Sequence, residues 1–329
     1  MITVTAVGNY PKIGNQVGGQ AFRQAIWRLD RGEIGPDDLI EVGRQVTKEV
    51  IDEQISCGVD LVTDGQILWD DQVSRFATGL NGLEIGGLVR YFDTNTYYRQ
   101  PTASGQVSWQ DPILVRDWLY ASQISSRPVK AIITGPYTLA CLISRPDALP
   151  LAELALSLAD GLNQELKALA AAGAQWLQID EPAMVHNPAL RYPRDFGLFK
   201  ETCSRLTSGV DRPVALYTYF GHVADLAGLF SLPFDVFGLD MIQGPENTDL
   251  LSQLPAGKSL ALGLVDARNI RMESTDEVAN RIHSMAERLG SDAMYVNPTC
   301  GLEFLPREEA LRKLENLAGG ARLAAGQPL

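Results

Sequence analysis

The stretch LAELALSLADGLNQELKALAAAGAQWLQIDEP, residues 151–182, decides the fold of this chain. Its first part, Leu151–Ala172, is rich in alanine and leucine and predicts a helix that ends at Gly173. Trp176–Ile179 follows as a short apolar run typical of a buried strand, and the run stops at Asp180. A helix followed closely by a buried strand, with polar residues directly after the strand, is the repeating unit of parallel β/α folds.

The same alternation extends over the whole chain. Seven further apolar or β-branched runs predict strands, and amphipathic stretches separate them. These runs are Ile2–Val7, Val59–Thr63, Val129–Thr134, Val214–Tyr217, Val236–Leu239, Leu260–Val265 and Ala293–Val296. Other helices are expected at Asp37–Cys57, His222–Phe230 and Thr275–Leu289. Eight strands are the number that a (β/α)8 barrel requires, so the sequence predicts an α/β protein of the TIM-barrel class.

One long segment interrupts the alternation after the second predicted strand. Residues 88–109 read LVRYFDTNTYYRQPTASGQVSW, with aromatic and β-branched residues around polar turns. This pattern predicts a hairpin excursion over the barrel mouth. No linker, low-complexity tract or internal repeat divides the chain, so residues 1–329 are expected to form a single barrel domain. A doubly wound sheet is the alternative fold, but the glycine spacing of its phosphate-binding loop is absent.

The composition argues against several classes of protein. Hydrophobic residues make up 45% of the chain and charged residues 21%, which is ordinary for a globular enzyme. A net charge of −12 without a Lys/Arg cluster argues against nucleic-acid binding. No membrane-length apolar run or signal-peptide pattern is found, so a cytoplasmic protein without membrane contact is expected. The four cysteines lie far apart without a CxxC pair, which fits a reduced compartment.

Polar residues follow the predicted strands, and in a TIM barrel such residues build the active site. They are Asn9, Asp64, Gln66, Asp180, Glu181, Thr218, Asp240, Asp266, Asn297 and Cys300. Helix capping is the alternative interpretation for Asp and Asn at strand-to-helix turns, and it stays open for Asp64 and Asp266 above all. Asp180 and Glu181 are adjacent carboxylates on a turn that ends in Pro182. They suit the binding of an amine or a shared proton.

Several motifs resemble the catalytic domain of cobalamin-independent methionine synthase. The matching stretches are VTAVGNYPK (4–12), VDLVTDGQ (59–66), TGPYTL (134–139), LQIDEPAM (177–184), LGLVDARN (262–269) and VNPTCGLEFLP (296–306). The combination of QIDEPA with NPxCGL is specific, and the resemblance covers nearly the whole chain. The chain looks like the stand-alone core form of that barrel, without the additional N-terminal barrel that helps full-length members bind a folate.

The resemblance implies an S-methyltransferase of methionine biosynthesis that acts on homocysteine or a related thiol. The implied methyl donor is a methylated corrinoid or a folate, and a corrinoid protein is the partner expected for the first of these. The family's zinc deprotonates the substrate thiol. Its ligands are a His-x-Cys at the fifth strand, a Glu at the sixth and a Cys after the eighth. Thr218, Phe220, Asp240 and Cys300 stand at those positions here.

Threonine and phenylalanine are not zinc ligands, so Asp240 and Cys300 are the candidate metal ligands that remain, and zinc dependence is in doubt. The resemblance assigns catalytic positions to Asp180, Asp240 and Cys300. It also implies an amino-acid pocket. In that pocket Val7, Gly8 and Asn9 meet the carboxylate of the substrate. Gln66 replaces the family's amine-binding Glu, and Asp180 is the expected partner of the ammonium.

Two other functions stay open at this point. One is a metal-free enzyme that acts on a small amino or carboxylic acid through Asp64, Asp180 and Tyr219. The other is a non-catalytic paralogue that keeps the amino-acid pocket and has lost the chemistry. The sequence fixes neither the methyl donor nor the acceptor nor the oligomeric state.

Overall fold

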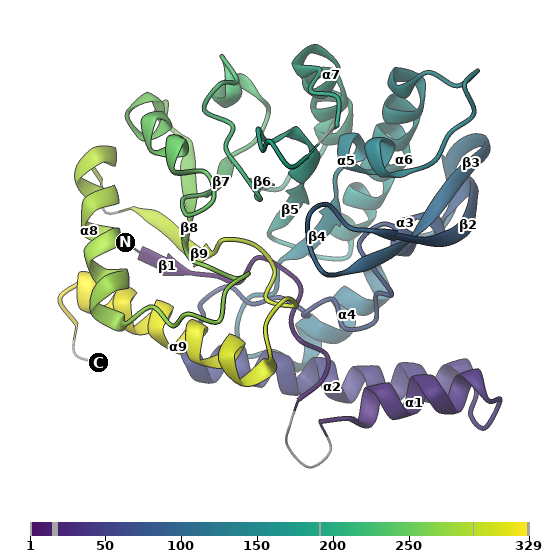
Figure 1. Cartoon of the computed structure of the whole chain (residues 1–329), viewed down its shortest axis with the longest axis horizontal. Coiled ribbons are helices and arrows are strands. Elements are labelled where there is room, and N and C mark those ends of the chain that lie inside the picture. The colour runs from purple at the N-terminus through teal and green to yellow at the C-terminus, as the bar shows by residue number, and fades with distance from the viewer. Residues whose placement is uncertain (1, 15–18, 191, 292, 328–329) are drawn as a thin grey trace. The chain divides into compact units, whose positions relative to one another are not determined.

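A computed structural model of the chain describes residues 2–14, 19–190, 192–291 and 293–327. Helices and strands alternate along these residues (Figure 1). Within the described residues, no helix combines the length and the apolar character needed to cross a lipid bilayer.

Seven strands form one sheet, in the order β1-β9-β8-β7-β6-β5-β4. The pairings described between neighbouring strands are parallel. Each strand overlaps one predicted from the sequence, which confirms the α/β TIM-barrel class. The strands are β1 (Ile2–Val4), β4 (Ala131–Thr134), β5 (Leu177–Asp180), β6 (Val214–Thr218), β7 (Val236–Asp240), β8 (Ser259–Val265) and β9 (Met294–Pro298).

The predicted strand Val59–Thr63 is reduced to two isolated parallel bridges. Thr5 pairs with Leu61, and Val62 pairs with Val129. The ladder is interrupted because the carboxylate of Asp60 accepts the backbone N–H of Val4 at 3.0 Å. With these bridges in place of the second predicted strand, all eight predicted strands have a counterpart in the structure.

Two of the helices begin and end at the residues that their capping signals predict. α2 starts with Pro36 and ends at Gly58, which adopts the left-handed backbone conformation with φ 93°. α8 starts at the capping box of Ser274 and Glu277, and its predicted bounds are confirmed. The helices are α1 (Ala21–Asp30), α2 (Pro36–Cys57), α3 (Ser74–Ala77), α4 (Val115–Ile124), α5 (Pro136–Leu142), α6 (Leu151–Ala171), α7 (Phe196–Thr207), α8 (Thr275–Leu289) and α9 (Arg307–Ala324). Short 3-10 helices are η1 (Pro182–Met184), η2 (Leu229–Ser231) and η3 (Pro245–Gln253).

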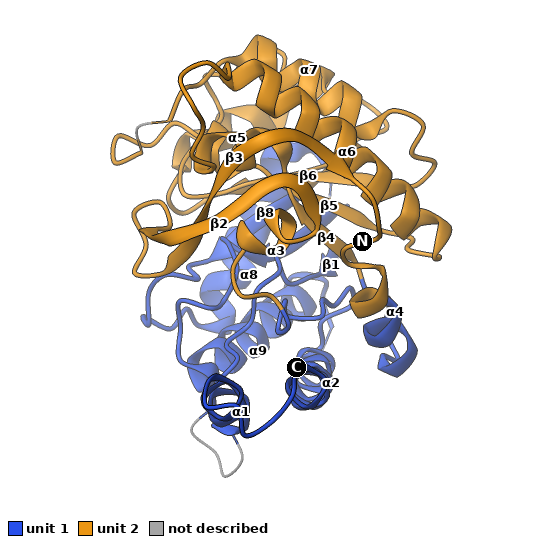
Figure 2. Ribbon diagram, turned by 90° about the vertical axis from the view of Figure 1, so that its right-hand side faces the viewer, with its two compact units in different colours: residues 1–68, 119–129, 261–329 blue, residues 69–118, 130–260 orange. Residues whose placement is uncertain are grey.

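The contacts of the chain group it into two compact units, which Figure 2 distinguishes by colour. The first unit comprises Met1–Leu68, Leu119–Val129 and Ala261–Leu329. The second comprises Trp69–Trp118 and Lys130–Leu260, and it holds β4 to β7. Each unit is described by itself. The single barrel domain over residues 1–329 stays a prediction.

A buried ion pair supports the loop after β8 in the first unit. Lys313 Nζ lies 2.7 Å from the carboxylate of Glu273, and both side chains are buried. Glu273 also accepts the backbone N–H of Asp266 at 3.0 Å. Pairing of both charges removes the cost of an isolated buried charge.

The predicted hairpin is confirmed in the second unit. β2 (Leu80–Arg90) and β3 (Tyr97–Trp109) pair in antiparallel fashion. The base of the hairpin is fixed by the buried Glu165 of α6. Its carboxylate accepts the indole N–H of Trp109 and the backbone N–H groups of Ile113 and Leu114, each at 2.8 Å.

The helix predicted at His222–Phe230 is wrong. His222 instead forms an antiparallel bridge with His186, and a 3-10 turn, η2, occupies the end of the segment. The backbone forms successive turns in place of a helix, because the N–H of Leu226 donates to the carbonyl of Val223 at 3.0 Å and the N–H of Leu229 donates to that of Leu226 at 3.2 Å. Gly228 then adopts a left-handed conformation with φ 83°, which a regular helix excludes.

Glu165→Gln tests the attachment of the hairpin to α6. The amide offers one acceptor oxygen to three N–H donors, so at least one buried N–H loses its partner. We expect the free energy of unfolding in urea to fall by about 1–3 kcal/mol. Glu153→Gln, an exposed change on the same helix, should alter it by less than about 0.5 kcal/mol. Equal effects from the two variants would contradict this role of Glu165.

Candidate active site

Asp180 ends strand β5 with its carboxylate held from two sides. Gln178 Nε2 donates to one carboxylate oxygen at 2.6 Å, and the hydroxyl of Tyr219 donates to the other at 3.1 Å. Asp180 is 6% exposed, and the donors come from β5 itself and from the residue after β6. Both donors thus fix the orientation of the buried Asp180 carboxylate.

Glu181 turns toward a different partner. Its two oxygens accept the backbone N–H groups of Tyr137 and Thr138, at 3.1 and 2.7 Å, at the start of α5. Gly135 lies so close that an added Cβ would collide with the Glu181 carboxylate. Burial raises the pKa of Glu181 to about 7, although the hydrogen bonds from Thr138 and Tyr137 oppose this. Glu181 therefore joins β5 to α5. Of the two adjacent carboxylates that were expected to bind an amine, Asp180 stays the candidate.

Lys130, just before β4, is a buried cation that the sequence analysis missed. It is 4% exposed, and its ammonium makes no hydrogen bond to a residue that the structure describes. The ammonium lies 4.8 Å from the ring centroid of Tyr217, a cation–π contact. Burial lowers the pKa of Lys130 to about 7, while the negative charge of Asp180 opposes this shift. The signal in the sequence was a lysine directly before the apolar run AIIT.

The positions of the family's His and Cys ligands are filled by other interactions. The Thr218 hydroxyl donates to the carbonyl of Gly238 at 3.1 Å. Phe220 is 1% exposed, and its ring packs 5.6 Å from that of Phe92 on the hairpin. Its backbone N–H donates to Asp240 at 3.2 Å. At the two inferred ligand positions, the Thr218 hydroxyl thus forms a hydrogen bond and the Phe220 ring forms an aromatic contact.

Zinc does not fit this set of side chains. The other oxygen of Asp240 accepts the backbone N–H groups of Ile242 and Gln243, at 3.0 and 2.9 Å, so the carboxylate is committed to its own turn. Across the described ranges of the chain, no group of three or more His, Cys, Asp or Glu side chains is arranged to hold a metal ion. The metal-ligand roles of Asp240 and Cys300 stay predictions.

In the first unit, the loop NPTCGLEF (297–304) folds around Asn9. Asn9 Nδ2 donates to Glu303 at 3.0 Å, and the N–H of Leu302 donates to the carbonyl of Asn9 at 2.8 Å. Cys300 is buried, with its Sγ 3.5 Å from the carbonyl of Gly301. Glu303 was missed by the sequence analysis, although it lies three residues after the predicted Cys300.

The other predicted residues of the first unit shape turns. The N–H of Gln66 donates to the Asp64 carboxylate at 2.9 Å, and the N–H of Arg268 donates to Asp266 at 2.9 Å. Both aspartates thus accept a backbone N–H two residues further on, in turns that no helix follows directly, so neither acts as the helix cap that the alternative interpretation predicts. Val7 is buried, the carbonyl of Gly8 accepts the Thr63 hydroxyl at 2.9 Å, and Asn297 Nδ2 donates to the carbonyl of Pro298 at 2.7 Å.

Three non-glycine residues adopt positive φ in the part of the chain that the structure describes: Gln66 at 53°, Phe92 at 51° and Phe220 at 78°. A left-handed backbone is unfavourable for an aromatic residue and persists where the surroundings enforce it. Phe220 is enforced from both sides, because its N–H binds Asp240 and its carbonyl accepts a hydrogen bond from Asn187. Such strain is concentrated at functional sites, and two of the three positions were singled out from the sequence.

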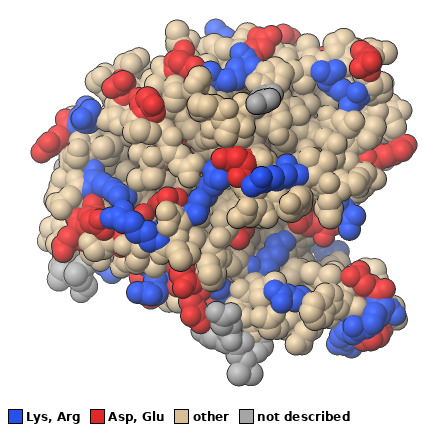
Figure 3. Space-filling model, viewed as in Figure 1, with Lys and Arg blue, Asp and Glu red and all other residues tan. Residues whose placement is uncertain are grey.

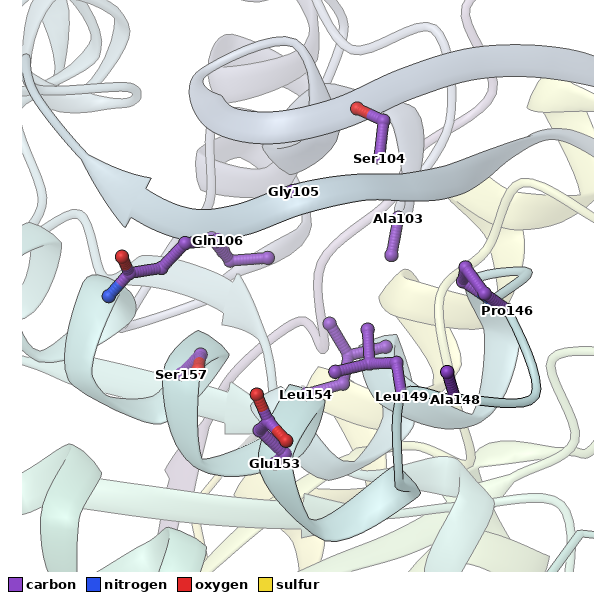
Figure 4. A pocket seen from close by; sticks show the side chains of 11 residues that line it. Ala103, Ser104, Gly105, Gln106, Pro146, Ala148, Leu149, Glu153, Leu154 and Ser157 are labelled. Atoms are coloured by element: carbon purple, nitrogen blue, oxygen red, sulfur yellow. The ribbon is translucent and has the colours of Figure 1, made fainter.

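A surface cavity of about 510 Å³ lies apart from these residues (Figure 4). Strand β3, the loop before α6 and the first turns of α6 line it, with the side chains of Leu154 and Glu153 on one wall. None of the predicted site residues contributes to the lining.

Acidic and basic side chains are interspersed on the molecular face in Figure 3.

The chain is similar to a group of known proteins over its full length. A family model for the catalytic domain of cobalamin-independent synthase matches residues 1–323. Methionine synthase of Sulfurisphaera tokodaii is 31% identical over 98% of this chain and 92% of its own, and that of Saccharolobus solfataricus is 29% identical over 98% and 95%. A solved B12-independent methionine synthase from Shewanella sp. W3-18-1, in complex with selenomethionine, shares the fold with a TM-score of 0.79. It is 21% identical and covers 98% of this chain and 97% of its own.

The pKa of Lys130 predicts how stability depends on pH. Between about 7 and the ordinary value of 10.5, the unfolded chain holds a proton on this lysine that the folded chain has released. Stability therefore rises with pH across this window, by at most about 1.4 kcal/mol per pH unit. Lys130→Met should remove this part of the dependence, measured by urea unfolding from pH 7 to 9. Parallel curves for the native chain and the variant would rule out the lowered pKa.

Metal analysis tests the poor fit to zinc. After incubation with zinc and dialysis, we expect far less than one zinc per native chain, because Thr218 and Phe220 supply no ligand. Asp240→Asn should leave the zinc content unchanged. Stoichiometric zinc in the native chain that is lost in Asp240→Asn would reinstate the metal site.

Proposed function

Because this chain belongs to the family of cobalamin-independent synthase catalytic domains, we propose that it transfers a methyl group to the sulfur of homocysteine or a closely related amino-acid thiol. The observation that carries the proposal is the buried Asp180 carboxylate, which Gln178 and Tyr219 hold and which lies in LQIDEPAM (177–184), a stretch that resembles the family. The names of the relatives, methionine synthases that cover nearly the whole chain, support the same reaction.

In the proposed mechanism, Asp180 receives the ammonium of the amino-acid substrate. A hydrogen bond between an ammonium and an ionised carboxylate is stronger than one between neutral groups. Gln178 and Tyr219 keep both carboxylate oxygens in fixed directions, so the substrate binds in one orientation. Orientation of the reacting atoms lowers the entropic part of the barrier to methyl transfer.

The reaction itself replaces a bond to hydrogen by a bond to carbon. The thiol loses its proton to solvent, its sulfur forms the new bond to the methyl carbon, and the donor leaves with the electrons of its former bond to that carbon. The donor class, folate or methylated corrinoid, stays a prediction, and so does a corrinoid protein as partner. The proposal assigns no metal to this step, because the side chains at the inferred ligand positions do not fit zinc.

A second candidate function is a protein that binds an amino acid without chemistry. Phe220 favours it, because a buried ring occupies a position where the family has a ligand for the thiol-activating metal. The two candidates share the Asp180 pocket and differ in turnover. Formation of methionine from homocysteine, assayed with methylfolate and with methylcobalamin, separates them. Binding of methionine without turnover from either donor would favour the second candidate.

Asp180→Asn tests the amino-acid pocket that both candidates need. Loss of the charge-assisted hydrogen bond should weaken the binding of L-methionine roughly 10-fold to 100-fold. The desamino analogue 4-(methylthio)butanoate lacks the ammonium, so its binding should change little. Calorimetric titration of both ligands measures the two effects. Asp211→Asn, an exposed change in the same unit, serves as the matched control.

If Asp180→Asn weakened both ligands equally, the ammonium role of Asp180 would be wrong. The amino-acid pocket proposed here would then have to be assigned to other residues.

A further inference from the structure

Lys130 and Asp180 are opposite charges buried within the same unit. Lys130 precedes β4, and Asp180 ends the adjacent strand β5. Tyr217 of β6, which pairs in register with Asp180, presents its ring to the Lys130 ammonium at 4.8 Å. Neither charge is exposed enough to be stabilised mainly by water, so each depends on the groups around it.

The Lys130 ammonium has few sources of stabilisation. Within the described part of the chain it makes no hydrogen bond, which leaves the ring of Tyr217 and the charge of Asp180 as its favourable neighbours. Asp180 also accepts a hydrogen bond from Tyr219 and another from Gln178, both of them neutral donors. The negative charge of Asp180 favours the protonated form of Lys130.

An ammonium ligand on Asp180 would cancel that favourable charge. It would bring a second positive charge into the same buried region, and two like charges in a weakly polar environment repel strongly. Burial would then act on Lys130 almost without opposition. Burial favours the neutral amine, and it already holds the pKa of this lysine at about 7 while Asp180 acts against it.

We propose that Lys130 is the counter-ion of Asp180 in the free protein and releases its proton to solvent when the ammonium of an amino acid binds Asp180. This inference rests on the proposed function, because it takes Asp180 to be the ammonium site. In the molecules where Lys130 is protonated, the charge of the bound ammonium replaces the charge of the lysine beside Asp180. Lys130 is thus a positioning residue, which acts through Asp180 and has no assigned contact with the ligand.

The exchange has a thermodynamic signature. If ligand binding releases a proton from Lys130, a higher pH must favour ligand binding by the same linkage. Near pH 7 about half of the lysines are protonated, so binding should release up to about half a proton per ligand. A lysine with a merely structural role would release none.

Calorimetric titration with L-methionine, repeated at pH 7 in two buffers of different ionisation enthalpy, counts the protons released. The native chain should release a fraction of a proton, and Lys130→Met should release none. The methionine side chain has a similar length without charge, and replacement of a buried charge by an apolar group is often tolerated. Lys130→Gln provides a second neutral variant. The native chain titrated with 4-(methylthio)butanoate, which lacks the ammonium, should also release none.

The outcomes separate the inference from the proposed function. Equal proton release by the native chain and both lysine variants would overturn the role of Lys130 alone. Tight binding of both ligands, with no loss specific to methionine in Asp180→Asn, would instead overturn the ammonium site. No binding of methionine to the native chain would overturn the proposed function and, with it, the inference. Proton release that requires both the lysine and the ammonium of the ligand supports the exchange.

Discussion

A charge that leaves water must find a partner, and this constraint shapes the second unit around Asp180. The carboxylate is buried at the end of β5, so its hydrogen-bond donors have to come from the protein itself. Gln178 lies two residues earlier on the same strand, where side chains return to the same face, and Tyr219 follows the neighbouring strand. The parallel arrangement of β5 and β6 brings these groups together without long connections. Fold and site therefore depend on the same strand register.

Much of the fold could be predicted because its signals are local. The alternation of apolar runs with amphipathic helices defined the strands, and capping residues such as Ser274 fixed the start of a helix. The helix prediction for His222–Phe230 was wrong because the structure of this segment depends on contacts that are not local. Its composition permits a helix, but His222 pairs in a bridge with His186, which is distant in sequence, and Gly228 adopts a left-handed conformation. Tertiary contacts of this kind override local preference and leave no mark in the segment itself.

The sequence predicted which positions contribute candidate site residues, but it predicted few of the contacts that their side chains make. Asp180, Phe220 and Asp240 were located because they follow strands and align with a known family. The contacts of Phe220 with Phe92 were not predictable, because the hairpin and β6 are far apart in sequence. Lys130 was not predicted as a site residue, because the sequence around a single lysine beside an apolar run does not indicate on which side of the strand the lysine points. Its significance depends on Tyr217 and Asp180, which come from two other strands.

The close approach of Gly135 to Glu181 has a consequence for how this protein can change over generations. Any side chain at position 135 would collide with the Glu181 carboxylate, whereas loss of that carboxylate would clear the space. A side chain at 135 therefore requires the Glu181 carboxylate either to move from its present position or to be lost. Loss of the carboxylate would in turn leave the N–H groups of Tyr137 and Thr138 without their acceptor. Variation at position 135 is thus tied to the two hydrogen bonds that Glu181 accepts, and the two positions can be expected to vary together.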